Sequence, residues 1–246
     1  MKTYGIIGFP LTHSFSQQYF TEKIEKDGVT DAVFHSFPLT TIEAFPALLA
    51  DHPSLKGIAV TIPYKEKVLQ YIDHLSEEVK QIGAANCIRI NADGLTAFNT
   101  DIIGFERSFI KKLKPDHKKA LVLGTGGASK AVQYVLNKLG IKFLIVTRNE
   151  PVAENNIQYV DLTEAVVTEY NVIINTTPLG MSPQEDTCPD IPYQLLTAGH
   201  YLYDLVYAPA KTLFLQKGEE QGAAIENGFE MLIIQAEENW RLWNEA

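Results

Sequence analysis

A lysine follows a short apolar run at a point where a strand should end. The run extends from Ile58 to Ile62, Pro63 interrupts it, and Lys65 comes two residues later. Lysine is common on helix surfaces, so solubility is one explanation. Catalysis or ligand binding is the other, because ligands bind at the carboxyl ends of strands in open α/β sheets. The rest of the chain has to decide between them.

A carboxylate and an amide supply two further reactive or binding groups. Asp101 is the first residue of a predicted helix, where the helix dipole stabilises a negative charge. Gln235 shares one face of the last predicted helix with Met231 and Leu232, by i, i+3 and i+4 spacing. An amide among apolar neighbours needs a buried partner. A backbone group or a substrate hydroxyl would serve equally well.

Two serines, Ser14 and Ser16, follow the first predicted strand at alternate positions. Their hydroxyls could bind a ligand together. They could also simply cap the helix that is predicted to follow, which is the ordinary role of a serine there.

A glycine-rich turn, GTGGASK at residues 124–130, follows a predicted strand and opens a predicted helix. This is the context of a dinucleotide-binding turn. Gly124 would permit the tight turn, and Gly126 would let the backbone approach a pyrophosphate at the helix N-terminus. The third fingerprint position is Ser129, which is small enough for close packing. The alternative is that these glycines only turn the chain.

The end of the next predicted strand indicates which cofactor would bind. NAD is usually held through its ribose hydroxyl by an acid about 20 residues after the turn. Here the strand ends in Thr147-Arg148-Asn149. A guanidinium would attract a 2′-phosphate, so the sequence favours NADP. The missing acid also argues against S-adenosylmethionine, while an exposed surface arginine is the alternative.

Composition and charge exclude several classes of protein. With 46% hydrophobic and 21% charged residues, the 246-residue chain is typical of a globular protein. The formal net charge of −9 argues against nucleic-acid binding, which needs cations to neutralise phosphates. The one dense basic run, residues 111–119, is interpreted as a solvated linker. No apolar run approaches the roughly 20 residues that span a bilayer.

The cysteines and histidines do not predict a metal site. Cys87 and Cys188 are 101 positions apart, and the six histidines form no HExxH pair. Free thiols suggest a reducing compartment, the cytoplasm. The N-terminus, MKTYGIIGFP, is interpreted as a first strand rather than a secretory signal.

Helical and strand-like periodicities alternate along the chain, which predicts an α/β architecture. Buried strands are expected at YGIIGF, AVFHSF and GIAVTI, followed by a hairpin of NCIRI and LTAFNT around an Asp-Gly turn. After a connecting helix near residues 102–113, a second series begins at residue 118. Its four expected strands are ALVLG, KFLIVTR, NVIINTT and YLYDLVY, and they alternate with helices as in parallel βαβ units.

Eight short motifs together carry a resemblance to a known family. They are SFS from Ser14, VTIPYK from Val60, GAAN from Gly83, NTDIIG from Asn99, GTGG from Gly124, NTTPLGM from Asn175, DLVYAP from Asp204 and GFEMLIIQ from Gly228. In this order, over nearly the whole chain, they resemble shikimate dehydrogenases.

The resemblance implies NADP-dependent, reversible reduction of 3-dehydroshikimate to shikimate, a step of chorismate and aromatic amino-acid biosynthesis. It implies two α/β domains: a substrate domain of residues 1–103 and 226–246, and a Rossmann-type NADP domain of residues 104–225. The C-terminal helix would pack back on the first domain. The implied partner is a small-molecule substrate, with no nucleic acid or membrane, and the implied assembly is a monomer or homodimer.

The family's functional residues map onto three groups of positions in this sequence. The resemblance implies a catalytic pair of Lys65 and Asp101. The implied substrate-binding residues are Ser14, Ser16, Thr61, Asn86, Tyr207 and Gln235. The implied cofactor-binding residues are Glu77, Gly124, Thr125, Gly126, Gly127, Ala128, Thr147, Arg148, Leu205 and Gly228.

Three positions depart from the family's pattern. Cys87 replaces the usual threonine after Asn86, and Lys130 stands where arginine is common. The family's basic residue a few positions beyond Arg148 is missing, since NEPVAEN supplies none. The grip on a 2′-phosphate would then be weaker, and the preference for NADP less strict.

Oxidation of a secondary alcohol by a nicotinamide needs a group that exchanges the hydroxyl proton. An ammonium can stabilise the alkoxide and deliver a proton. We therefore expect Lys65 to exchange the proton while Asp101 orients it and the hydroxyl. The alternatives are a quinate/shikimate dehydrogenase with relaxed NAD/NADP use, a dinucleotide-binding regulator without turnover, and a glycine-rich methyltransferase.

Overall fold

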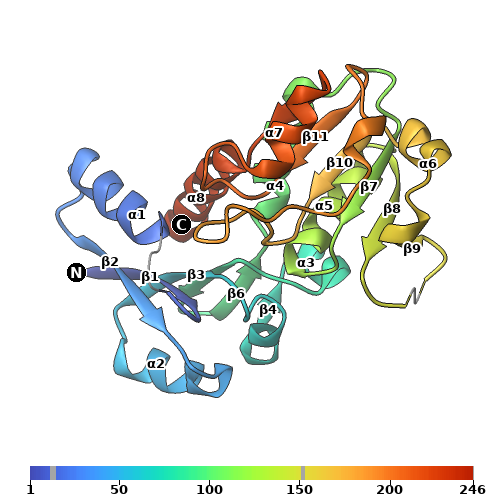
Figure 1. The fold of residues 1–246 in the computed structure, drawn as a ribbon. Coiled ribbons are helices and arrows are strands. Elements are labelled where there is room, and N and C mark those ends of the chain that lie inside the picture. Colours follow the sequence, from blue (N-terminus) through green and yellow to red (C-terminus); the bar gives the residue numbers. More distant parts are fainter. Residues whose placement is uncertain (12–14, 151–152, 246) are drawn as a thin grey trace. The chain divides into compact units, whose positions relative to one another are not determined.

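The computed structural model describes residues 1–11, 15–150 and 153–245. The chain forms two compact units. Unit 1 comprises Met1–Thr100 and Gln235–Ala246, and unit 2 comprises Asp101–Ile234. Each unit is built around its own six-stranded sheet. Figure 1 shows the two sheets. The α/β fold class expected from the periodicity is therefore confirmed.

The sheet of unit 1 mixes parallel and antiparallel strands. Parallel pairs join β1 (Lys2–Gly8) to both β2 (Ala32–Pro38) and β3 (Leu55–Val60). The hairpin of β5 (Cys87–Asn91) and β6 (Gly94–Phe98) is antiparallel, with Asn91 opposite Gly94, as the Asp-Gly turn predicts. A two-residue strand, β4 (His74–Leu75), completes the order β2-β1-β3-β5-β6-β4.

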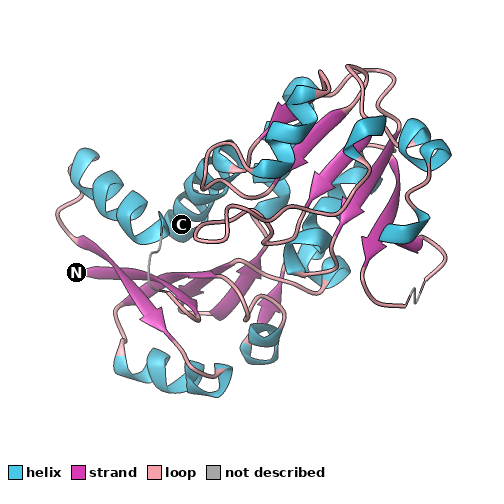
Figure 2. Cartoon of the chain, viewed as in Figure 1, coloured by secondary structure: helices cyan, strands magenta, loops and turns pink. Residues whose placement is uncertain are grey.

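Helices of unit 1 pack apolar side chains against this sheet. Figure 2 shows helices in cyan and strands in magenta. The helices of unit 1 are α1 (Phe15–Lys26), α2 (Phe45–Asp51), α3 (Glu77–Ile82) and the C-terminal part of α8 (Phe229–Asn244). The ring of Tyr4 on β1 lies 5.0 Å from that of Trp240 and 5.4 Å from that of Trp243, centroid to centroid. The end of α8 thus packs into the core of unit 1, as expected for the C-terminal helix.

The sheet of unit 2 is parallel throughout. Its order is β12 (Ala224–Glu226), β11 (Tyr201–Asp204), β10 (Val172–Asn175), β7 (Lys119–Leu123), β8 (Lys142–Thr147) and β9 (Asn156–Gln158). The chain starts at β7, moves outward through β8 to β9, and then crosses to β10. This is the doubly wound Rossmann order, and ligands bind where the direction reverses, between β7 and β10.

Two strands of unit 2 were not predicted. The edge strands β9 and β12 have three residues each and no fully buried residue. Such short, half-buried segments carry no periodicity that could identify them, and only pairing with β8 and β11 defines them as strands. The central strands, by contrast, are buried apolar runs, which is typical of parallel sheets.

The remaining helices of unit 2 are α4 (Asp101–Phe109), α5 (Gly127–Lys138), α6 (Glu164–Glu169) and α7 (Leu213–Glu220). Helix α4 packs on β11 through aromatic rings. The Phe109 and Tyr201 rings stack at 5.4 Å, and Ser108 Oγ lies 2.6 Å from the Tyr203 hydroxyl.

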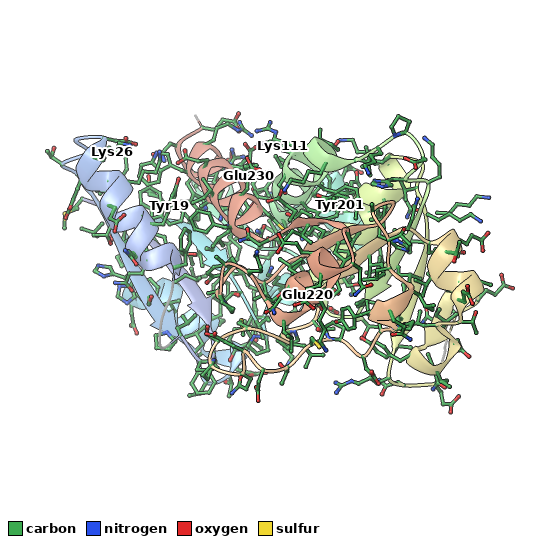
Figure 3. The ribbon with its side chains drawn as sticks, turned by 45° about the horizontal axis from the view of Figure 1, so that its top comes forward. Tyr19, Lys26, Lys111, Tyr201, Glu220 and Glu230 are labelled. Atoms are coloured by element: carbon green, nitrogen blue, oxygen red, sulfur yellow. The ribbon has the colours of Figure 1, made fainter. Side chains whose placement is uncertain are left out.

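The basic run at residues 111–119 is mostly exposed and connects α4 to β7, as expected for a solvated linker, but several of its lysines form ion pairs. Lys111 forms an ion pair with Glu230 at the start of α8, and both are labelled in Figure 3. Lys112 pairs with Glu226 at 2.7 Å, and Lys119 pairs with Glu169. These lysines tie the entry of unit 2 to its other elements. Their acidic partners are distant in sequence, so local sequence patterns could not predict these ion pairs.

Candidate active site

Lys65 lies just after the carboxyl end of β3, which ends at Val60. The turn that carries it begins with Thr61, whose N–H donates to the Ile7 carbonyl over 2.9 Å. The helix that follows is a short 3₁₀ helix, Lys67–Tyr71, and Lys65 precedes it. The lysine is half-buried at the strand edge, so it is not a residue of an exposed helix surface.

Asn86, Thr100, Gln235 and Asn239 form a buried network of polar side chains, which we call the amide cluster. Thr100 N–H donates to Asn86 Oδ1 over 2.7 Å, and Asn86 Nδ2 donates to Gln235 Oε1 over 3.3 Å. The Thr100 hydroxyl donates to Asn239 Oδ1 over 2.7 Å. All four residues are buried. The buried partner that we expected for the Gln235 amide on the apolar face of α8 is thus another side chain, that of Asn86.

Two members of the amide cluster were missed at the level of sequence. Asn239 lies one helical turn after Gln235 in α8, so the same i, i+4 spacing that singled out Gln235 could have found it. Thr100 stands between two residues that were already noted, but a threonine before a helix has an ordinary capping role. Their relation to Asn86 depends on long-range contacts.

Asp101 begins α4 and is buried, with 6% of its surface exposed. Its neighbour in the chain, Thr100, is the last residue of the first segment of unit 1, and Asn86 accepts a hydrogen bond from the Thr100 N–H. A carboxylate in the first turn of a helix faces unpaired backbone N–H groups and the positive end of the helix dipole.

The other expected substrate residues lie at strand and helix ends. Ser16 is the second residue of α1 and is buried, so it is not the cap of this helix. Ser14 falls outside the described residues. Tyr207 is half-buried after β11 in unit 2, and burial raises the pKa of its hydroxyl.

The glycine turn of unit 2 has the geometry that its sequence predicts. Gly124 adopts φ +109°, and a Cβ there would lie 2.9 Å from Thr176 Oγ1, so glycine is required. Helix α5 begins at Gly127 after the extended Gly126. A Cβ on Gly126 would meet nothing within 4 Å, so its backbone faces open space. The hydroxyl of Ser129 donates to the Gly124 carbonyl over 2.8 Å and closes the turn.

A cavity of about 580 Å³ lies beyond the ends of β8 and β10. Thr147 and Arg148, two of the residues that the resemblance implies for the cofactor, are among its lining residues. The further lining residues, none of them predicted, are Gln158, Tyr159, Val160, Thr177, Pro178, Leu179, Cys188 and Asp190. A volume in the 300–1,000 Å³ range, with one guanidinium and several hydroxyls among apolar side chains, fits a phosphorylated nucleoside. The residues present therefore suit the adenosine end of NADP.

A buried carboxylate, Asp204, joins the loops behind this cavity. It is fully buried, and burial raises its pKa to about 6. It accepts hydrogen bonds from Thr212 Oγ1 at 2.5 Å, from Asn175 Nδ2 at 2.9 Å and from Val206 N–H at 3.0 Å. Asn175 in turn accepts from the Thr177 hydroxyl, which lines the cavity.

Two expected cofactor positions meet beside this network. Gly228 N–H donates to the Val206 carbonyl over 3.1 Å, and a Cβ on Gly228 would lie 2.1 Å from the Leu205 carbonyl oxygen. The close approach of Leu205 and Gly228 thus requires a glycine. Glu77, by contrast, lies at the start of α3 in unit 1, where it pairs with Lys80 at 2.6 Å.

Within residues 1–11, 15–150 and 153–245, no group of three or more histidine, cysteine or acidic residues could hold a metal ion. Over the same residues, no helix is both long enough and apolar enough to cross a membrane.

Comparison with known proteins gives a consistent picture. Residues 6–88 match the family model of the shikimate dehydrogenase substrate binding domain. A shikimate dehydrogenase (NADP(+)) of Caldicellulosiruptor saccharolyticus is 34% identical to this chain, over 99% of the chain and 92% of the relative.

Solved structures cover the whole chain. A chorismate mutase/shikimate 5-dehydrogenase fusion protein from Clostridium acetobutylicum superposes with a TM-score of 0.89 at 33% identity, covering 100% of this chain and 92% of that one. Shikimate 5-dehydrogenase from Thermus thermophilus, in complex with NADP(H) and shikimate, gives 0.83 at 27% identity, covering 100% and 94%. Quinate dehydrogenase from Corynebacterium glutamicum, in complex with NAD, gives 0.87 at 25% identity, covering 100% and 94%.

Proposed function

Because the chain belongs to the shikimate dehydrogenase family, we propose that it catalyses the reversible, NADPH-dependent reduction of 3-dehydroshikimate to shikimate. The observation that carries the proposal is the Arg148-lined cavity beyond the ends of β8 and β10, whose lining residue Thr177 lies against Gly124 of the glycine turn. Ligands of doubly wound folds bind at this place, and its donor groups match a phosphorylated dinucleotide.

NADPH supplies the hydride, and the residues of this chain exchange the proton and bind the substrate. Lys65 donates a proton to the oxygen that becomes the 3-hydroxyl, and in the oxidative direction it accepts that proton back. As an ammonium it also stabilises negative charge on this oxygen before the proton moves. Asp101 orients the same hydroxyl by accepting a hydrogen bond from it.

The substrate is a ring with hydroxyls and a carboxylate, and the proposed binding groups match both. Asn86 and Gln235 present amides from the amide cluster, and Thr61 and Tyr207 add hydroxyls. Ser14 and Ser16 are the proposed partners of the carboxylate. The buried bonds of Asn86 support this assignment, because they hold its amide in one orientation before the substrate arrives.

NADP would be held by backbone N–H groups of residues 124–128 at the pyrophosphate and by Thr147 and Arg148 at the 2′-phosphate. We further propose that Leu205, Gly228 and Glu77 lie along the nicotinamide half. A second candidate, relaxed use of NAD, is favoured by one observation. Asp190 lines the same cavity as Arg148, and a carboxylate there would weaken the binding of a 2′-phosphate but not of a ribose hydroxyl.

We assign the substrate-binding role to residues 1–103 and 226–246 and the NADP-binding role to residues 104–225. We place the enzyme in the cytoplasm as a monomer or homodimer.

The test is to mix purified protein with shikimate and NADP⁺ and to follow the absorbance of reduced nicotinamide. In parallel assays NAD⁺ replaces NADP⁺, and quinate replaces shikimate. Rapid reduction of NADP⁺ by shikimate supports the proposal, and comparable rates with NAD⁺ support relaxed cofactor use. Tight binding of both ligands without turnover would contradict the proposed catalysis and indicate a regulatory role.

A further inference from the structure

The backbone of Lys65 is bonded to a segment that is distant in sequence. The carbonyl of Lys65 accepts a hydrogen bond of 2.8 Å from Ala85 N–H. Lys65 itself belongs to neither a strand nor a helix, since β3 ends at Val60 and the 3₁₀ helix begins at Lys67. Its position therefore depends on individual bonds of this kind rather than on a regular ladder.

The peptide group that holds Lys65 is itself held from the other side. The carbonyl of Ala84 and the N–H of Ala85 belong to one planar peptide group. Asn99 Nδ2 donates to this carbonyl over 2.9 Å, in a buried hydrogen bond. Ala84 and Ala85 are both fully buried, so water does not compete for either group. The peptide group is thus clamped between the side chain of Asn99 and the backbone of Lys65.

An asparagine at position 99 would destabilise the fold if its only role were to fill space. It is 6% exposed, and its other amide atom, Oδ1, is buried without a hydrogen-bond partner among the described residues. A buried acceptor without a partner destabilises the fold. The Asn99 side chain thus makes one hydrogen bond, from Nδ2, and leaves Oδ1 unpaired. Its contribution lies in the peptide group that the Nδ2 bond positions.

We propose that Asn99 is a positioning residue that fixes Lys65 for proton transfer through the Ala84–Ala85 peptide group. The inference rests on the proposed function, because it assumes that Lys65 exchanges the proton. Without the Asn99 donor the peptide group can tilt, and the turn that carries Lys65 loosens with it. Proton transfer is sensitive to such displacements, since the donor and acceptor must come within hydrogen-bond reach.

Asn86 should be affected much less than Lys65. Its own backbone is bonded independently, with its N–H donating to the Phe98 carbonyl over 3.1 Å and its carbonyl accepting from Val60 N–H over 2.8 Å. Loss of the Asn99 donor is therefore expected to change kcat while leaving the KM for shikimate nearly unchanged.

The experiment uses Asn99→Leu and Asn99→Val, which both remove the donor and keep a side chain of similar size. If one of them fails to fold, the other still tests the proposal. Thr3→Val is the matched control, because Thr3 is 7% exposed and loses one part-buried hydrogen bond, to Ser54 Oγ at 2.8 Å, near the start of β1. Thermal unfolding, followed by the fluorescence of Trp240 and Trp243, verifies that all variants are folded.

The first readout needs no substrate. Hydrogen exchange of the Ala85 amide in the free protein should accelerate in both Asn99 variants and stay at the wild-type rate in Thr3→Val. The second readout is steady-state kinetics as a function of pH. We expect kcat to fall by roughly 10- to 100-fold, as for other small misplacements of catalytic groups. The pH profile of kcat should also shift, with KM for shikimate within about twofold.

The same substitutions in a Lys65→Met background separate the two proposals. If Asn99 acts through Lys65, then Asn99→Leu should not lower the residual kcat of Lys65→Met any further. Wild-type kcat and pH profile in the Asn99 variants, or an equal loss in the Lys65→Met background, would overturn the inference alone. Full activity of Lys65→Met by itself would instead overturn the proposed role of Lys65.

Discussion

The side-chain amides of Asn86 and Gln235, 149 positions apart, are joined by a hydrogen bond of 3.3 Å from Asn86 Nδ2 to Gln235 Oε1. One residue precedes β5, and the other lies in the helix that ends the chain. Each amide thereby restricts the rotation of the other. A ligand that binds to both then meets groups that are already oriented, which lowers the entropy cost of binding.

Replacement of Gln235 by leucine should weaken substrate binding. The acceptor for Asn86 and Asn239 disappears, while most of the side-chain volume remains. We expect the KM for shikimate to rise about 5- to 150-fold, equivalent to the roughly 1–3 kcal/mol lost when a buried polar group is left unpaired. Steady-state kinetics measure the change.

Asn244→Leu is the control for Gln235→Leu. Asn244 lies in the same helix and accepts a hydrogen bond from the Tyr4 hydroxyl over 2.8 Å. An equal rise in KM in this control would mean that α8 as a whole, rather than the Gln235 amide, had been disturbed.

Replacement of Lys65 by methionine should abolish most of the turnover without unfolding the protein. Methionine keeps the aliphatic stem and removes the amine. We expect kcat to fall by about 10²–10⁴-fold, which is the usual contribution of a general acid or base. A kcat within a factor of about three of wild type would rule out the proton-transfer role.

Replacement of Arg148 by glutamine should change the choice between the two nicotinamide cofactors. The exposed guanidinium would lose a charge-assisted bond to the 2′-phosphate, worth about 1.5–3 kcal/mol. Binding of NADP⁺, measured by calorimetry, should weaken about 10- to 100-fold, while NAD⁺ binding stays unchanged. Arg107→Gln, at another exposed arginine of unit 2, should affect neither cofactor. Equal losses for both cofactors would exclude contact with the 2′-phosphate.

Replacement of Gly126 by alanine should separate ligand binding from folding. A Cβ at this position meets no protein atom within 4 Å, so the melting temperature should stay within a few degrees of wild type. The methyl group would, however, occupy the space where a pyrophosphate approaches the turn. We expect NADP⁺ to bind at least about tenfold more weakly. Undiminished binding would indicate that these glycines only turn the chain.

The buried carboxylate of Asp204 should make stability depend on pH. Burial raises its pKa to about 6, so between its unfolded value of 3.8 and pH 6 the folded protein binds more protons than the unfolded one. Stability from this group is therefore gained as pH falls. Relative to Asp204→Asn, the wild-type protein should gain about 1 kcal/mol between pH 7 and pH 5. Urea unfolding of both proteins at the two pH values measures this, and parallel changes would contradict it.

Much of the fold follows from local patterns. Alternating apolar periods predicted the order of the main helices and strands, because a parallel strand buried on both faces must be apolar along its length. The Asp-Gly turn predicted the hairpin, and the glycines of residues 124–127 predicted the strand–turn–helix. Each of these features depends on neighbours within a few residues, and the amino-acid sequence shows such neighbours directly.

Contacts between residues that are distant in sequence could be learned only from the tertiary structure. The amide cluster required α8 to return to unit 1, and the clamp on Lys65 required Asn99 to reach a peptide group 15 positions earlier. The cavity is lined by Tyr159, Thr177 and Cys188, which come from three separate segments of the chain. Hydrogen bonds and buried surfaces of this kind are satisfied by whichever groups the packing brings together, and no local period encodes which groups those are.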